Sequence, residues 1–184
     1  MEVALWLFAV QAAIGAFDTL YYHEWKARLP ARAPQTSPEL QIHAVRDFLY
    51  FILFLTLPWL EWHGVWAWIL GCIFLAEIAL TLTDFVVEMK VRKPIGDVFA
   101  GERVTHAIMG IIYGAAVANL FPSLLQWAST STEFAAARHD APVALRWLLT
   151  ASSLGVFASG IRDLYAAFEM PFGAWPWKRE RQTS

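Results

Sequence analysis

The sequence EWKARLP at residues 24–30 returns with the same spacing as EMKVRKP at residues 88–94. A second matching pair follows, ELQIH at residues 39–43 and ERVTH at residues 102–106, and each is completed by a later tyrosine, Tyr50 or Tyr113. Self-similarity of this kind indicates a duplicated supersecondary unit. We therefore expect two related helical hairpins, repeat one at about residues 3–60 and repeat two at about residues 65–127.

The composition is that of a membrane protein. Of the 184 residues, 58% are hydrophobic and only 16% are charged, which is more apolar surface than a soluble domain of this size can bury. A helix needs roughly 20 residues to cross a hydrocarbon core of about 30 Å. Five apolar segments approach or exceed that length, at about residues 3–22, 43–60, 65–87, 104–125 and 143–168. We predict an all-α, polytopic membrane protein with five transmembrane helices, forming one domain over residues 1–184.

The distribution of lysine and arginine predicts the orientation of these helices. The cations gather between the first two spans, between the third and fourth, and in the C-terminal tail, whereas the opposite ends carry only Arg138 and Arg146. The positive-inside rule then places the N-terminus outside and the C-terminus in the cytoplasm, with a bacterial inner membrane as the expected location. Both copies of the repeat face the cytoplasm, so they are parallel copies related by an axis along the membrane normal. The two hairpins are expected to form a pseudo-twofold four-helix bundle, with the helix at about residues 143–168 added to it.

The repeat carries side chains that suit a metal site. Residues four and eleven positions apart share one face of a helix, so each even-numbered span offers a carboxylate, an imidazole and a deeper phenol. A glutamate at the end of each odd-numbered span arrives at the same membrane level. The predicted ligands are Glu24, Glu39, His43, Glu88, Glu102 and His106.

Oxygen and imidazole ligands favour two divalent ions, with iron preferred and zinc or manganese as alternatives. Four carboxylates this close would resist ionising together, and two cations would remove that conflict. The order Glu, then Glu with a nearby His, repeated once, resembles the ligand order of the ferritin-like di-iron carboxylate proteins, which include membrane-associated quinol oxidases. The resemblance implies a di-iron centre held by the six ligands above. The spacing here is Glu-x-x-x-His, one residue longer than in that family, and the ligands lie at helix ends rather than deep in the bundle.

Two other interpretations of the same residues remain open. The four glutamates could be interfacial carboxylates in a duplicated ion-pair network with neighbouring lysines and arginines. The histidines His43 and His106 could instead be axial ligands of a haem b between two membrane helices, although four matched glutamates would then have no role.

Further ionisable residues lie inside the predicted spans, where a functional role is the default hypothesis. Asp84 is one turn from Glu88 and is a candidate ligand or catalytic group, together with Tyr50 and Tyr113. Asp18 has a comparable depth but is out of register with Asp84. The roles of Asp18, Glu77 and His23 are left open between supporting the site and structure. Arg46, Asp47, Arg162 and Asp163 are expected to form an ion-pair network that docks the fifth span onto the second.

The sequence therefore predicts a membrane di-metal oxidoreductase that activates dioxygen near the cytoplasmic face. Its substrate would be lipophilic, such as a lipid, a hydrocarbon or a quinol, in an apolar cavity lined by residues including Phe48 and Ile112. The alternatives are a di-zinc hydrolase that activates water, and a non-enzymatic haem-binding or structural subunit of a larger membrane complex. The chain has no nucleotide-binding motif, so electrons would come from another protein or a quinol. A homo-oligomer is compatible with the sequence, and no nucleic-acid partner is expected.

Overall fold

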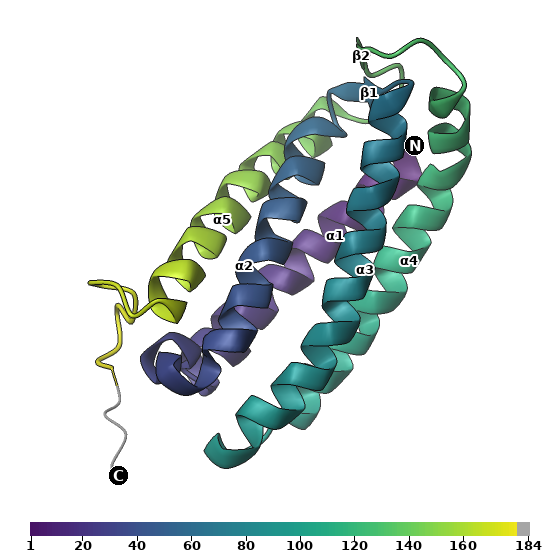
Figure 1. Cartoon of the computed structure of the whole chain (residues 1–184). Helices are drawn as coiled ribbons and strands as arrows, with labels where there is room; N and C mark the ends of the chain where they lie inside the picture. Colours follow the sequence, from purple (N-terminus) through teal and green to yellow (C-terminus); the bar gives the residue numbers. More distant parts are fainter. Residues whose placement is uncertain (180–184) are drawn as a thin grey trace.

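The computed structural model describes residues 1–179 and shows five long α-helices running side by side (Figure 1). The α-helices are α1 (Glu2–Asp18), α2 (Ala33–Thr56), α3 (Val65–Arg92), α4 (Ala100–Ala128) and α5 (Val143–Ala167). The shorter elements are a π-helix η1 (Thr19–Lys26), the 3-10 helices η2 (Leu29–Arg32) and η3 (Lys93–Ile95), and the strands β1 (Leu60–Trp62) and β2 (Phe134–Ala136). The all-α class is confirmed.

Four of these helical segments are long and apolar enough to cross a membrane. They are Glu2–Lys26, Val65–Ile95, Ala100–Ala128 and Val143–Ala167. Large apolar side chains on their outer faces are well exposed, with Leu75 68%, Ile111 73% and Leu154 62% accessible. An apolar outer surface of this extent is what a lipid environment requires, so the fold indicates a membrane protein.

The helix α2 is not among the four candidate spans. Its 24 residues are long enough, but residues 33–47 include the charged Glu39, Arg46 and Asp47, and only the segment after Asp47 is continuously apolar. The fifth span therefore stays a prediction.

The packing order of the helices differs from a four-helix bundle with an added fifth helix. The helix α1 packs on α4, α4 on α3, α3 on α2 and α2 on α5, and α5 also touches α1. Thus α5 completes a ring, in which its contact with α2 is the most extensive of all. The aromatic core inside the ring joins Phe8, Phe54 and Tyr113, with ring centroids 6.1 Å and 6.3 Å from Phe8.

The two ends of the ring are closed differently (Figure 1). At one end, β1 and β2 pair antiparallel, with Glu61 opposite Ala135. The Glu61 carboxylate accepts hydrogen bonds from His63 Nε2 at 2.9 Å and from the backbone N–H of Arg138 at 2.8 Å. Partial burial raises the pKa of Glu61, but these two hydrogen bonds outweigh it and hold the pKa below its usual value. The connections that carry the repeated sequences lie at the other end.

The helix α2 starts at Ala33, so that Ser37 and Pro38 lie inside it. Pro34 occupies the first turn, where a missing N–H is tolerated. Ser37 does not cap the helix, because its hydroxyl donates a hydrogen bond to the carbonyl oxygen of Ala167 at 3.0 Å. The same hydrogen bond ties α2 to the end of α5.

The expected ion-pair network between α2 and α5 is wrong. Arg46 pairs with Glu77 and Asp84 on α3, and Arg162 pairs with Glu24. The two helices instead approach closely at Gly160, where an added Cβ would lie 3.1 Å from Asp47 Cβ and 3.2 Å from the carbonyl oxygen of Ala44. Close backbone approach joins α5 to α2, and the charge pair between these helices among the described residues is the long contact of His43 Nδ1 with Asp163 at 4.0 Å.

We predict that Gly160→Leu destabilises the protein, because its side chain has no room between α5 and α2. The expected loss in the free energy of unfolding is about 1–3 kcal/mol or more, the usual cost of overpacking. Chemical unfolding in detergent micelles measures it. The matched control is Gly114→Leu on α4, where an added Cβ meets nothing within 4 Å. Equal stability of the two variants would show that the α2–α5 contact is not close.

Candidate metal centre

The inner end of α1 changes from an α-helix to the π-helix η1, and this places Asp18 and His23. Five residues separate Asp18 from Glu24, whereas three separate Asp84 from Glu88. Each π-type hydrogen bond spans one more residue than an α-type bond, so a π segment takes up extra residues without a break in the helix. The eight residues of η1 absorb this difference. Single-turn π segments are frequent at functional sites.

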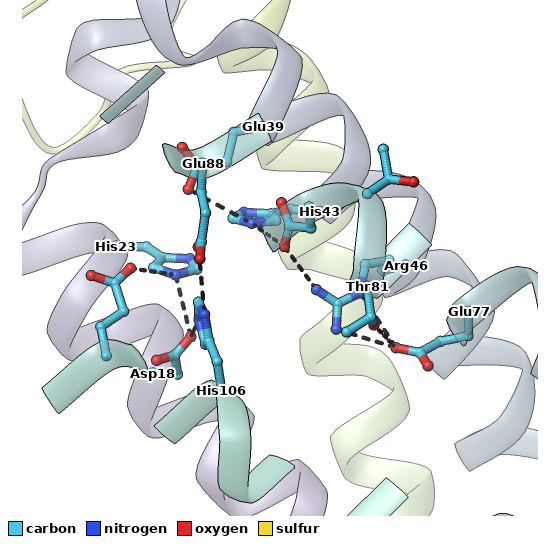
Figure 2. Close-up of polar contacts among 12 residues, drawn as sticks. Asp18, His23, Glu39, His43, Arg46, Glu77, Thr81, Glu88 and His106 are labelled. Atoms are coloured by element: carbon cyan, nitrogen blue, oxygen red, sulfur yellow. Dashed lines mark hydrogen bonds and ion pairs between the residues drawn. The ribbon is translucent and has the colours of Figure 1, made fainter. Parts of the chain in front are cut away.

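The residues Asp18, His23 and His106 form a buried group that could hold a metal ion. One ligand atom from each lies within 4.8 Å of the other two. Asp18 Oδ2 is 3.2 Å from His23 Nε2 and 3.1 Å from His106 Nε2. Figure 2 shows the three side chains pointing toward one another. One carboxylate and two imidazoles are a donor set suited to iron, zinc or manganese.

Two glutamates flank this group. Glu88 Oε2 lies 3.4 Å from His106 Nδ1, and Glu102 Oε1 lies 3.2 Å from His23 Nε2. Among the described residues, Asp18 Oδ1 and Asp84 Oδ1 are buried here without a hydrogen-bond partner, and the buried atoms His23 Nε2, Glu88 Oε2 and His106 Nδ1 have only the ion-pair contacts of 3.2–3.4 Å given above. Orphaned buried polar atoms are uncommon, and a bound cation would satisfy them. The residues present therefore fit a metal ion.

A second set of contacts lies beside the first, on α2 and α3. His43 Nε2 is 3.3 Å from Asp84 Oδ2, and Arg46 Nη1 donates to the same oxygen at 3.0 Å. Arg46 also donates to Glu77 Oε1, at 3.2 Å from Nη2 (Figure 2). The ring of His43 stacks on that of His23, with centroids 4.7 Å apart and planes 9° apart. The two sets are thus in direct contact through their imidazoles.

The contacts of the two sets are reciprocal. His43 of α2 meets Asp84 of α3, and His106 of α4 meets Asp18 of α1. Asp18 and Asp84 are therefore structural counterparts, although the sequence puts them out of register. The sequence did contain a signal for Asp18, because an aspartate inside a membrane span is energetically costly unless it has a role. His23 has no counterpart in the second copy. It is one of the extra residues that the π-helix η1 accommodates.

Arg92 occupies the space between two of the predicted ligands. It donates to Glu39 Oε1 at 2.7 Å and to Glu102 Oε1 at 2.9 Å, and all three side chains are essentially inaccessible. In the sequence this arginine counts toward the membrane topology, and it is also one of the basic neighbours in the alternative ion-pair network; its contacts with Glu39 and Glu102 agree with that alternative. No sequence signal identifies it, apart from its place one turn after Glu88.

Glu24 lies apart from the other predicted ligands. It accepts hydrogen bonds from Arg162, including one from Nη2 at 2.8 Å, and from Trp177 Nε1 at 3.4 Å. Its counterpart Glu88 points inward to His106. The structure therefore brings together Glu88, Glu102 and His106, keeps His43 and Glu39 next to them, and does not bring in Glu24.

The tyrosines of the repeat lie deeper, with their ring centroids 5.9 Å apart. Tyr50 donates a hydrogen bond to Glu77 Oε1 at 3.0 Å and accepts one from Gln11 at 3.1 Å. A cavity of about 340 Å³ between α1, α2 and α5 reaches Asp18, His23, His43 and His106 and continues to Tyr50. A smaller cavity of about 180 Å³ between α3 and α4 includes Tyr113. Phe48 and Ile112, expected in the substrate cavity, line neither of these two.

The chain matches no family model, no curated protein and no solved structure at a level that would identify a relative. Its function has to be inferred from the side chains and cavities described above.

We predict that Arg92→Met destabilises the protein strongly, because Glu39 and Glu102 would stay buried without their cation. Removing one partner of a buried ion pair costs about 3–5 kcal/mol. Unfolding in detergent micelles measures the loss, and adding Glu39→Gln should restore part of it.

The control for this prediction is Arg103→Met, which removes an ion pair with Asp97 that is more than half exposed. Exposed pairs contribute roughly 0–1 kcal/mol, so this variant should unfold nearly as the parent does. If Arg92→Met were as mild as Arg103→Met, the buried clamp would have no stabilising role.

Proposed function

We propose that this protein is a membrane-embedded di-metal oxidoreductase that activates dioxygen and acts on a lipophilic substrate. The single observation that carries the proposal is the buried Asp18–His23–His106 group at the wall of an apolar cavity. A ligand-type cluster inside a hydrophobic pocket is the usual arrangement of an active site. The metal-binding residues are thereby revised from the six that the sequence suggests.

The charge balance of the buried network favours two divalent ions. Six buried carboxylates on α1 to α4 take part, from Asp18, Glu39, Glu77, Asp84, Glu88 and Glu102; the buried Asp163 on α5 is counted separately, since it lies at the edge of the network, 4.0 Å from His43 Nδ1. Arg46 and Arg92 are the arginines paired with them among the described residues, which leaves four negative charges. Three protonated histidines would still leave one. Two divalent cations balance all four while the imidazoles stay neutral, which is the form that binds metals.

The second ion is assigned to His43 and Asp84. Their contact repeats that of His106 with Asp18, as expected for two copies of one hairpin. The stacked rings of His23 and His43 keep the two positions adjacent. A glutamate lies next to each position. Glu88 contacts His106 at the first, and Glu39 Oε1 is 3.9 Å from His43 Nε2 at the second.

Iron at this centre would supply electrons to dioxygen. The protein's own part is to hold the ligands in a water-poor interior and to fix their orientation. Tyr50, Glu77, Arg46 and Asp84 form a continuous set of hydrogen bonds that ends beside His43. The substrate would enter the cavity between α1, α2 and α5, and electrons would come from a partner protein or a quinol. We place this end of the molecule at the cytoplasmic face of a bacterial inner membrane, because the loop cations gather there.

Metal analysis of the purified protein tests the site. We expect about two iron ions per chain, lost wholly or mostly in Asp18→Asn and His106→Gln and reduced to about one in Asp84→Asn. The matched control is Glu24→Gln, which should keep its metal because Glu24 binds Arg162 instead. Metal loss in Glu24→Gln with retention in Asp18→Asn would favour the ligand set suggested by the sequence.

The identity of the metal separates the reaction classes. Iron together with dioxygen consumption in the presence of a lipophilic reductant supports the oxidoreductase. Two zinc ions with lipid hydrolysis would replace it by the di-zinc hydrolase, and a Soret band would replace it by a haem protein. A folded preparation that binds no metal at any supplied concentration would exclude the proposed function.

A further inference from the structure

Two carboxyl groups in the large cavity take no part in the proposed metal centre. Asp47 on α2 and Asp163 on α5 both line it, on the side formed by the α2–α5 contact. Gly160 sets their separation, because it lets the backbone of α5 approach Asp47 and Ala44. Their position is therefore a consequence of the most extensive helix contact in the fold.

Neither carboxyl group is paired with a lysine or arginine among the described residues. Asp163 is only 7% exposed, and its nearest basic contact is His43 Nδ1 at 4.0 Å, which is beyond hydrogen-bond distance. Asp47 is hydrogen-bonded to Ser159. Two carboxylates facing one apolar space repel each other when both are ionised. A cation placed between them would remove this repulsion.

The cavity opens sideways, between α1 and α5. Ala16 and Leu20 on α1 and Gly155 on α5 line the cavity and are also exposed on the outer surface. Small residues line both sides of this opening, namely Ala12 and Gly15 on α1 and Ser152 and Ser159 on α5. Because both helices are candidate membrane spans, this mouth faces the region where lipid chains would lie. A ligand can enter from the bilayer without crossing the polar surface.

The size of the cavity suits a small lipophilic ligand. A volume of about 340 Å³ lies at the lower end of the roughly 300–1,000 Å³ that ligand pockets have. The wall beyond the carboxyl groups is apolar, with Phe54, Val156 and Met109 among its residues.

We propose that this cavity binds a single-chain lipophilic amine, with its ammonium group against Asp47 and Asp163 and its chain along α1 and α5. The ammonium group donates up to three hydrogen bonds, and the two carboxylates accept them. The further step of identifying this amine as the substrate rests on the proposed function, because the same cavity reaches Asp18 and His106. The binding itself needs no metal.

Binding of dodecylamine, dodecanol and dodecanoate to the purified full-length protein in detergent micelles tests the inference. Native mass spectrometry and the ligand-dependent shift in unfolding temperature report binding. We expect dodecylamine to bind at least tenfold more tightly than the other two. Asp47→Asn and Asp163→Asn should each weaken amine binding about tenfold, and Asp97→Asn at the exposed α3–α4 connection should leave it unchanged.

A variant at the mouth makes the test independent of the carboxyl groups. An added Cβ at Gly155 meets nothing within 4 Å, so Gly155→Leu should fold normally and still block entry. Equal binding of dodecanoate, or unchanged amine binding in both aspartate variants or in Gly155→Leu, would overturn the inference.

The failure of this inference and of the proposed function can be told apart with Asp18→Asn. This variant should lose metal and still bind dodecylamine. Amine binding without any metal in the parent protein would exclude the di-metal centre alone, and metal binding without amine selectivity would exclude the amine site alone.

Discussion

The interior of this protein depends on how buried negative charge is neutralised. Arg92 joins Glu39 to Glu102, and Arg46 joins Glu77 to Asp84, so helices α2, α3 and α4 are held together by guanidinium groups inside an apolar shell. Burying a carboxylate without a partner is far more costly than burying it with one. The two arginines are too few for the carboxylates present, and this shortage is the physical basis for placing metal ions next to them.

The change of helix type in α1 has a specific chemical effect. The π-helix η1 accommodates the extra residues between Asp18 and Glu24 without breaking the helix. Asp18 thereby stays at the same height in the bundle as His106, which it contacts. The π segment also brings in His23, which contacts Asp18 and Glu102 and stacks on His43. The segment between Asp18 and Glu24 thereby supplies an imidazole that the shorter segment between Asp84 and Glu88 lacks.

Sequence reasoning predicted the helices well and the contacts of their side chains only in part. Apolar segment length was enough to place α1, α3, α4 and α5, because that signal extends over twenty residues. The pairing of Glu24 with Arg162 could not be predicted, since it depends on α5 entering the ring beside α1. Arg92 was counted as a topological cation and as one of several possible partners of the glutamates, because its position next to a loop does not show which way its side chain points. His106 and Glu88 were correctly expected to lie together, since both belong to the inward faces of neighbouring helices.

The polar part of α2, residues 33–47, has a consequence for how the protein is assembled in a membrane. This segment carries Glu39, Arg46 and Asp47, and it packs against α3 on one side and α5 on the other. Both of these helices follow α2 in the chain, so the segment leaves the ribosome before either has been synthesised. Insertion of α2 as an independent helix would expose these charges to lipid, at several kcal/mol for those near the centre. We therefore expect α2 to stay at the membrane surface or in the insertion machinery until α5 has been synthesised. Insertion of α2 into the bilayer would then be completed only after α5 is present.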